Sequence, residues 1–368
     1  MTRVGVVGGG QLARMMIPAA INLGVDLSVF AQAKHSSAAL AVTMIGDHTN
    51  WAELEKFAST VDVITFDHEH VPLEHLERLR AQGAVVRPPP QALALTHNKI
   101  SMREAFATLH LPQPRWAVAI HGENINPAID AVGGFPCIAK LPVGGYDGKG
   151  VRLIDAPDQI DDWLTLGPVL LEEKIGFVRE IAQLLARTPL GEWATWPGVE
   201  TRQVDGVCSV VVAPAVGMAD ETNADATRIA RVIASEFDVV GVLAVELFEC
   251  PDGRLLVNEL AMRPHNSGHV FTELSVTSQF EQHLRAVLGY PLGSTDFVSG
   301  VGVMANIFGE VDRERGRIAA QRYPHAKIHS YQKFPRAGRK AGHVVVLGED
   351  VDTVLAAALD VQAIFERS

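Results

Sequence analysis

The chain has 368 residues, of which 47% are hydrophobic and 20% charged, a composition that excludes a disordered chain and predicts two or three domains at roughly 100 to 200 residues each. The net charge of -11 lacks the excess of positive charge that attracts phosphate backbones, so no nucleic-acid partner is expected. The three cysteines have no metal-like spacing, and no apolar run reaches the ~20 residues that cross a membrane, so we expect a cytoplasmic protein without a membrane contact.

The first third of the chain alternates strands with helices, a pattern typical of a parallel, doubly wound sheet. A stiff run from Pro88 to Pro90 follows, and the first domain boundary is expected shortly after it, with 1–97 as the first domain. The predicted strands are 3–7, 25–30 and 61–66, and the predicted helices are 11–23, 51–59 and 73–82.

The pattern then changes, which indicates an α+β domain over 98–291 and a small third domain over 292–368. The third domain is expected to hold strands around a basic loop and a closing helix. The predicted strands are 169–173, 180–186, 207–212, 242–248, 255–259, 302–308 and 343–347, and the predicted helices are 99–109, 224–237 and 351–365.

Glycines mark the first turn, because Gly8, Gly10 and Ala13 fit the pattern G-x-G-x-x-G/A between a strand and a helix. A dinucleotide site also needs an acidic residue after the second strand, where Ala31 and Gln32 stand instead. We therefore favour another phosphate-bearing substrate at this helix N-terminus, with glycines that serve only a tight turn as the alternative.

The segment Asp67 to His70 follows the third predicted strand, at the sheet edge where doubly wound proteins bind ligands. Capping of the next helix is the competing interpretation.

A second glycine-rich loop, 144–150, holds four glycines and Lys149, so backbone amides and an ammonium group can surround a polyphosphate. It is not a Walker A loop, since Gly150 follows the lysine and a strand-like segment comes next. Lys140 on the preceding strand strengthens the prediction of a flexible hairpin lid, and a plain glycine turn is the alternative.

Two carboxylates are expected on neighbouring strands, because Glu246 lies in an apolar strand and Glu259 ends the next one after a hairpin at 250–254. Magnesium prefers such oxygen ligands, so this pair predicts a metal site beside Asn258. A salt bridge is the alternative explanation for a glutamate in an apolar strand.

A polar loop follows at 263–269, with a guanidinium, two imidazoles and an amide. Arg263 offers a bidentate fork and Asn266 adds a directed donor, a set that suits a small oxyanion. The spacing of His265 and His269 also permits zinc, but no third ligand is evident, and His269 also fits a structural donor.

Basic residues cluster near the end of the chain, where a phosphate-binding loop and a solvated surface are both consistent with composition. The residues concerned are Lys333, Arg336, Arg339, Lys340 and His343.

Four segments together resemble the 5-(carboxyamino)imidazole ribonucleotide synthases, ATP-grasp enzymes of bacterial and fungal purine biosynthesis. They are GGGQLARM at 8–15, GGYDGKG at 144–150, NELAMRPHNSGH at 258–269 and GRKAGH at 338–343. The resemblance runs through nearly the whole chain. Other ATP-grasp enzymes share the lid and the glutamate pair but lack the HNSGH and GRK-x-GH segments.

The resemblance implies an ATP-grasp fold in three domains: a biotin-carboxylase-like domain at 1–97, an ATP-grasp domain at 98–291 with a mobile lid at about 112–175, and a small domain at 292–368. It implies a homodimeric ligase that uses ATP and Mg²⁺, without biotin. The implied reaction is carboxylation of 5-aminoimidazole ribonucleotide by bicarbonate through carboxyphosphate, with release of ADP and phosphate.

The resemblance also implies roles for individual residues. Glu246 and Glu259 would bind Mg²⁺, and Arg263, His265 and Asn266 would hold bicarbonate and carboxyphosphate as catalytic residues that also contact the substrate. The residues expected around ATP are Lys99, Lys140, Gly145, Tyr146, Asp147, Gly148, Lys149, Gly150, Glu172, Glu173, Lys174, Ile175, Glu180, Gln203, Asn258 and Glu259. Those expected around the ribonucleotide are Gln11, Leu12, Glu69, Tyr146, Lys333, Arg339 and Lys340.

Some positions depart from the family pattern. Gln203 replaces a frequent histidine near the nucleotide, Met262 a usual proline, Asp67 a usual glutamate, and Asn98-Lys99 a common Asp-Arg. Three other functions are weighed: another ATP-grasp ligase such as a formate-dependent glycinamide ribonucleotide transformylase, a dinucleotide-dependent oxidoreductase, and a nucleotide-binding regulator without turnover.

Overall fold

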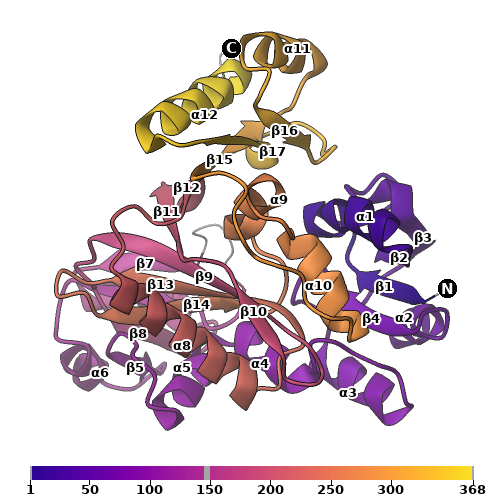
Figure 1. The fold of residues 1–368 in the computed structure, drawn as a ribbon. Helices are drawn as coiled ribbons and strands as arrows, with labels where there is room; N and C mark the ends of the chain where they lie inside the picture. Colours follow the sequence, from indigo (N-terminus) through magenta and orange to yellow (C-terminus); the bar gives the residue numbers. More distant parts are fainter. Residues whose placement is uncertain (1, 145–149, 367–368) are drawn as a thin grey trace.

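The structure, a computed structural model, describes residues 2–144 and 150–366, which form three sheets (Figure 1). The first is a four-stranded sheet in the order β3-β2-β1-β4, and its strands pair in parallel, which confirms the predicted doubly wound sheet. Its strands are β1 (Arg3–Val7), β2 (Asp26–Ala31), β3 (Val42–Ile45) and β4 (Val63–Phe66), with helices α1 (Gln11–Leu23), α2 (Trp51–Ala58) and α3 (Leu73–Ala81).

Two helices then lead away from this sheet, α4 (Pro90–His97) and α5 (Lys99–Thr108). Pro90 begins α4 because a first-turn proline lacks only an N–H that would be unpaired in any case. Asn98 caps α5, accepting from the backbone N–H groups of Ile100 and Ser101 at 2.8 and 3.3 Å. An asparagine here therefore performs the capping that an aspartate would perform.

A second, antiparallel sheet has four strands in the order β5-β8-β6-β7. Lys140 pairs with Val151 across β6 and β7, so the predicted glycine-rich loop does join two antiparallel strands. The elements are β5 (Trp116–Ala119), α6 (Asn126–Ala131), β6 (Cys137–Lys140), β7 (Val151–Ile154), α7 (Asp161–Leu164) and β8 (Val169–Glu173).

The third sheet has nine strands and runs without a break from the middle of the chain into its last part. β12 pairs with β15, which places Val211 opposite Met304. Its strands are β9 (Arg179–Arg187), β10 (Trp193–Thr195), β11 (Val199–Val204), β12 (Val207–Ala213), β13 (Gly241–Glu249), β14 (Leu255–Ala261), β15 (Val301–Gly309), β16 (Lys327–Ser330) and β17 (Arg336–Gly348). The accompanying helices are α8 (Asp220–Glu236), α9 (Phe271–Leu274), α10 (Gln279–Leu288), α11 (Arg313–Arg322) and α12 (Val351–Glu366).

The prediction of a basic loop near the C-terminus is wrong for most of its residues. Arg336, Arg339 and Lys340 belong to β17, where Lys340 pairs with Phe308 of β15. The basic and glycine residues of 336–342 do not alternate with apolar residues, so the sequence does not predict a strand there. Pairing with the apolar strand β15 stabilises the extended backbone instead.

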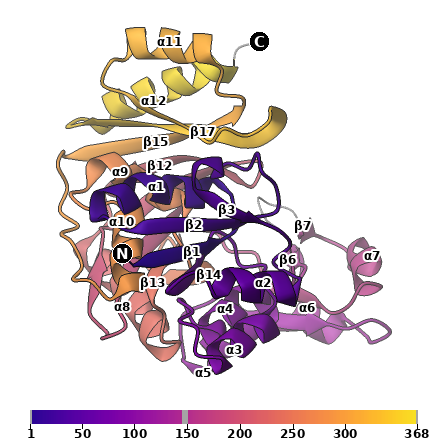
Figure 2. The same cartoon turned by 90° about the vertical axis from the view of Figure 1, so that its right-hand side faces the viewer.

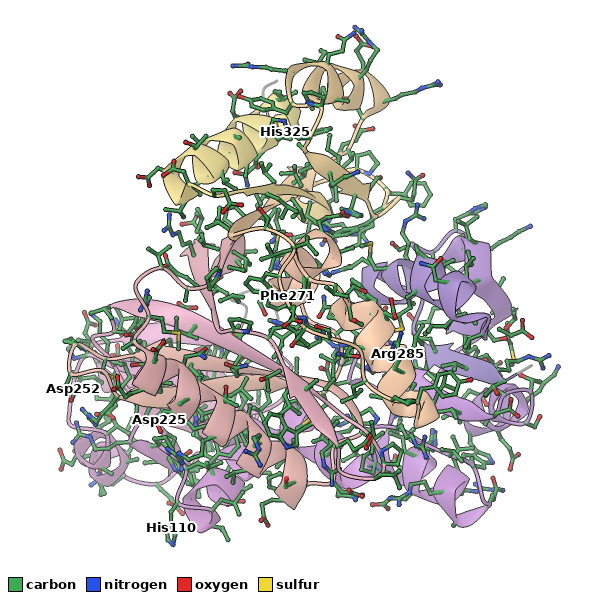
Figure 3. All side chains as sticks on the ribbon, viewed as in Figure 1. His110, Asp225, Asp252, Phe271, Arg285 and His325 are labelled. Atoms are coloured by element: carbon green, nitrogen blue, oxygen red, sulfur yellow. The ribbon has the colours of Figure 1, made fainter. Side chains whose placement is uncertain are left out.

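In Figure 2 helix α1 of the first domain lies below the last strands, and Arg14 of α1 donates to the Ser330 carbonyl of β16 at 2.9 Å. Helix α10 packs against α1 of the first domain, and α12 covers β15 and β17. Figure 3 labels Phe271 of α9 near the centre of the molecule and Arg285 of α10 on the side of α1. The first domain, helix α10 and the last strands, which are far apart in the sequence, are therefore neighbours in the structure.

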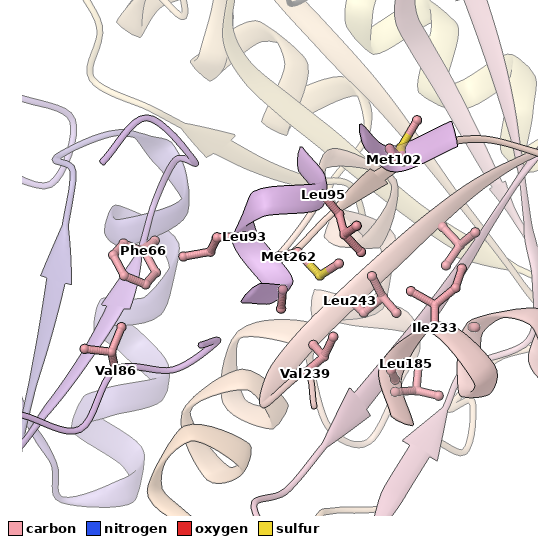
Figure 4. Packing of buried hydrophobic residues seen from close by; sticks show 14 of the residues in the cluster. Phe66, Val86, Leu93, Leu95, Met102, Leu185, Ile233, Val239, Leu243 and Met262 are labelled. Carbon is pink, nitrogen blue, oxygen red and sulfur yellow. The ribbon is translucent and has the colours of Figure 1, made fainter. Parts of the chain in front are cut away.

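The largest apolar cluster joins α4 to the nine-stranded sheet (Figure 4). Met262 is fully buried in it together with Leu93, Leu95 and Leu243. This departure from the family pattern therefore serves packing. Within the described residues, no helix is both long and apolar enough to cross a membrane.

Candidate active site

The N-terminus of α1 holds a carboxylate of the protein itself. The two oxygens of Asp67 accept hydrogen bonds from the backbone N–H groups of Gly10 at 2.5 Å and Ala13 at 3.0 Å. A Cβ at Gly10 would lie 2.2 Å from Asp67 Oδ2, so only glycine allows this contact. The predicted phosphate site at this helix N-terminus is therefore wrong, because Asp67 fills the position where an anion would bind.

Glu246 and Glu259 are direct partners across the antiparallel β13–β14 pair, as the hairpin predicts. Their side chains therefore start from one face of the sheet, close enough to share a cation. Burial alone would raise the pKa of Glu246, but His265, Lys340 and Lys140 lower it, so this carboxyl remains ionised.

A magnesium ion fits this pair of carboxylates. Mg²⁺ is usually bound by one or two carboxylates together with phosphate oxygens and water, so two protein ligands suffice. Within 2–144 and 150–366, three or more His, Cys, Asp or Glu side chains do not converge as a metal site, which speaks against the zinc alternative at His265 and His269.

Lys140 is held by two groups at the end of β6, an inner strand of the small sheet. Its Nζ lies 2.9 Å from Glu172 Oε2 and donates to Asn258 Oδ1 at 2.9 Å. Glu172 also pairs with the fully buried Arg103, whose Nε is 2.7 Å from Oε1. Burial would raise the pKa of Glu172, but Lys140 and Arg103 lower it to about 2. The ammonium group of Lys140 is thus fixed beside Asn258 at the site.

Arg103 also donates to the carbonyls of Val257 and Asn258, at 2.7 and 2.9 Å. It therefore ties α5 and the small sheet to β14, directly before Glu259.

Lys99 approaches the same place from α5, with its Nζ 3.5 Å from Glu259 Oε1. On β9, Glu180 accepts a hydrogen bond from Gln203 Nε2 at 3.0 Å, so the residue that departs from the family pattern holds a predicted ribose ligand. Burial, followed by the charges of Glu246 and Glu259, raises the pKa of Glu180.

The segment predicted to hold adenine continues β8. The Glu172 carboxylate is used in ion pairs, and Glu173 pairs with Arg115 at 2.7 Å. Lys174 and Ile175 line a pocket of about 620 Å³ against the 250–256 hairpin. Of the predicted lid, 145–149 lie outside the described residues, and Gly150 begins the return to β7.

The loop after β14 brings the predicted oxyanion ligands to the glutamate pair. Nε2 of His265 lies 3.1 Å from Glu246 Oε1, and its Nδ1 lies 2.8 Å from Ser267 Oγ. Nε of Arg263 lies 2.9 Å from Oε1 of the buried Glu69 in the first domain. The site therefore spans two domains.

Asn266 lies in the same loop. Within 2–144 and 150–366 the nitrogen and the oxygen of its side-chain amide are both buried without a hydrogen bond in ordinary geometry, and the amide lies near the Cys208 thiol, whose pKa it lowers. The nitrogen is a donor that an anion could accept from.

Three of the predicted ribonucleotide ligands, Gln11, Lys333 and Lys340, are joined by hydrogen bonds. Nζ of Lys333 donates to Gln11 Oε1 at 2.5 Å and to the Lys340 carbonyl at 3.1 Å, which joins the start of α1 to β17. The Leu12 side chain is buried in the core, and Arg339 is half-buried in β17.

Three family models match consecutive parts of the chain: the ribonucleotide synthetase preATP-grasp domain at 1–97, the ATP-grasp domain at 104–280 and the phosphoribosylaminoimidazole carboxylase C-terminal domain at 302–357. The N5-carboxyaminoimidazole ribonucleotide synthase of Mycobacterium tuberculosis is 48% identical over 365 residues, which cover 95% of this chain and 84% of that protein. The chain belongs to the N5-carboxyaminoimidazole ribonucleotide synthase family.

Solved structures agree with this assignment. A synthetase of this family in an ADP complex superposes with a TM-score of 0.91 at 31% identity, covering 99% of this chain and 97% of that one. The Aspergillus clavatus synthase, solved with ADP and 5-aminoimidazole ribonucleotide, gives a TM-score of 0.89 at 29% identity, covering 100% of this chain and 99% of that one. Among the functions weighed above, the family assignment favours the carboxylating ligase.

Two site residues of this synthase were not predicted from sequence. The sequence gives one indication of the role of Arg103: it lies among apolar residues in the predicted helix 99–109, and a buried arginine needs a charged partner. Gln279 contacts the 265–269 loop, and its sequence surroundings carry no signal of that contact.

Proposed function

We propose that this synthase carboxylates 5-aminoimidazole ribonucleotide with bicarbonate and ATP, and releases N5-carboxyaminoimidazole ribonucleotide, ADP and phosphate for purine biosynthesis. The observation that carries the proposal is the contact between Glu246 and His265, because these are the residues proposed to bind magnesium and bicarbonate. The complex of the Aspergillus relative with ADP and the aminoimidazole ribonucleotide supports the same substrates.

ATP would lie between the small sheet and the nine-stranded sheet. Lys99 and Lys140 would contact its phosphates, Glu180 its ribose, and the 172–175 segment its adenine. Glu246 and Glu259 would hold Mg²⁺, which when bound offsets phosphate charge. The lid residues 145–150 would cover the phosphates.

The proposed reaction has two displacement steps. A bicarbonate oxygen attacks the γ-phosphorus of ATP, the bond to ADP breaks, and carboxyphosphate forms. The substrate amine then bonds to the carboxyl carbon, the bond from that carbon to the phosphate oxygen breaks, and phosphate leaves with the pair of electrons. The amine loses a proton to a phosphate oxygen or a nearby base.

The protein contributes mainly position and charge. Arg263, His265 and Asn266 hold the carboxyphosphate, and Glu69, Gln11, Lys333, Arg339 and Lys340 hold the ribonucleotide against it. Proximity and electrostatic stabilisation are then the main catalytic effects.

Two further properties belong to the proposal. The enzyme acts as a homodimer, as the resemblance implies, and it works in the cytoplasm. The three cysteines are free, a state that fits a reducing compartment.

Release of ADP tests the function directly. Mg-ATP is supplied with bicarbonate and 5-aminoimidazole ribonucleotide, and each is omitted in turn. We expect ADP release to need bicarbonate and to rise sharply with the ribonucleotide. ADP release that ignores both, or that needs formate instead, would overturn the proposed substrates.

A further inference from the structure

Gln279 is fully buried at the first position of α10, and its side-chain amide binds the backbone of His265 twice. Its Oε1 accepts from the His265 N–H at 2.8 Å, and its Nε2 donates to the His265 carbonyl at 2.8 Å. Both backbone groups of one site residue are therefore paired with one side chain, which fixes where that residue stands.

The same amide also orders the end of the loop. Because the two backbone bonds fix which end of the amide carries nitrogen, the contact of Nε2 with His269 Nδ1 at 3.1 Å must run from Gln279 to His269. His269 is then neutral, with its proton on Nε2. Burial holds the pKa of His269 well below its usual value, in agreement with that state.

Gly268 shows how closely the loop approaches the amide. A Cβ at this position would lie 2.3 Å from Gln279 Oε1 and 2.4 Å from Leu184 Cδ2. Only glycine therefore permits the contact.

Helix α10 is itself anchored to two domains through His283. The Val242 N–H donates to Nδ1 at 3.1 Å, so the proton is on Nε2, which lies 2.8 Å from Thr65 Oγ1. Thr65 belongs to β4, the strand that ends just before Asp67 and Glu69. Gln279 thus projects from an element that is fixed to both sides of the site.

We propose that Gln279 is a positioning residue for bicarbonate activation: it holds the His265 backbone so that the imidazole faces Glu246 and the carboxyphosphate. This inference rests on the role proposed above for His265. A displacement near 1 Å in an active site costs about 10²-fold in rate, so loss of these bonds is expected to reduce turnover without removing any group that touches substrate.

The test compares Gln279→Met with Gln282→Met. Methionine keeps the length of glutamine without its hydrogen bonds. Gln282 is the matched control, because it is fully buried in the same helix and binds the N–H and carbonyl of one residue, Gly293, at 2.8 and 2.7 Å. We expect Gln279→Met to lower kcat by about 10- to 100-fold, to raise the KM for bicarbonate and to release more than one ADP per carboxylated product. The KM for ATP should stay near that of the unchanged enzyme, and Gln282→Met should keep normal kinetics.

A second variant, Gln279→Glu, provides a readout that a purely structural role would not produce. The new carboxyl, when protonated, can still accept from the His265 N–H and donate to the His265 carbonyl, although it lacks the second donor that glutamine offers to His269; when ionised it has no donor at all. Its activity relative to the unchanged enzyme should therefore rise as the pH falls.

The outcomes separate the two proposals. If His265→Ala keeps full turnover, the proposed role of His265 is wrong. If His265→Ala loses turnover while Gln279→Met behaves like Gln282→Met, the positioning role is overturned and the function stands. If Gln279→Met does not fold, the pH dependence of Gln279→Glu tests the positioning role instead. If the activity of Gln279→Glu relative to the unchanged enzyme does not change with pH, the inference is contradicted.

Discussion

Nε2 of His265 lies 3.1 Å from Oε1 of Glu246, so the loop after β14 contacts the carboxylate pair directly. Burial would raise the pKa of Glu246, and the bond from His265 is the foremost of the effects that lower it. Loss of the His265 side chain would therefore raise the pKa of Glu246. The proposed magnesium site and the proposed bicarbonate site are therefore in direct contact.

Glu259→Gln should lower turnover by about 10²-fold or more, because it removes the carboxyl group proposed to bind magnesium opposite Glu246. Steady-state ADP release over a range of Mg²⁺ concentrations measures it, and the apparent affinity for Mg²⁺ should fall. Glu236→Gln at the exposed end of α8 is the control. Turnover near normal in Glu259→Gln would remove the metal assignment.

Lys340→Ala should raise the KM for the ribonucleotide far more than the KM for ATP, because a phosphate anchor supplies binding that substrate and transition state share. Lys333 donates to the Lys340 carbonyl and to Gln11, so the proposed ribonucleotide ligands lie together on this side of the site. Lys327→Ala, an exposed change on the neighbouring β16, is the control. Equal effects on both KM values would contradict this placement.

Arg103→Met should destabilise the fold by about 3–5 kcal/mol, the range found when one partner of a buried ion pair is removed. It should also raise the KM for ATP. Without Arg103 the Glu172 carboxylate has Lys140 as its remaining ion-pair partner among the described residues, and Lys140 is a proposed ligand of the ATP phosphates. Urea unfolding and ATP titration measure the two effects. Arg187→Met is the comparison, because its partner Asp238 is largely exposed and such pairs contribute about 0–1 kcal/mol. Equal losses in the two variants would argue against a special role for Arg103.

Much of the fold follows from local patterns in the sequence. The β1–α1 unit and the Glu246–Glu259 pairing were predictable, because strand alternation and a short hairpin decide them. β3 was not predicted, since it is a short edge strand whose residues are only partly buried. Helix α4 was missed because a run of prolines marks its beginning.

Features of the site that depend on contacts between residues far apart in the sequence could not be predicted. Asp67 occupies the α1 N-terminus from 57 residues away, and this contact reverses the phosphate prediction made from the glycines. The pairing of β12 with β15 likewise joins the last strands to the large sheet, although the change in pattern near residue 291 suggests a separate unit. Both outcomes depend on tertiary packing, which local periodicity does not encode.

The buried histidine that anchors α10 predicts how stability depends on pH. Burial lowers the pKa of His283 from its ordinary 6.5 to about 3 in the folded protein. Above pH 6.5 the imidazole is neutral in both states and contributes no pH dependence. Below that value the unfolded chain takes up a proton that the folded protein cannot accept until about pH 3, so stability falls as the pH decreases through this window.

His283→Asn should remove this dependence while its side-chain oxygen still accepts the Val242 N–H. The slope of unfolding free energy against pH should fall by about 1.4 kcal/mol per pH unit, the value for one proton, between roughly pH 4 and 6. Urea unfolding at several pH values measures the slope. His325→Asn is the control and should change the slope little, because the His325 side chain is exposed to solvent in the folded protein. An unchanged slope in His283→Asn would mean that His283 takes up its proton in the folded protein, which would also break the assigned contact with Val242.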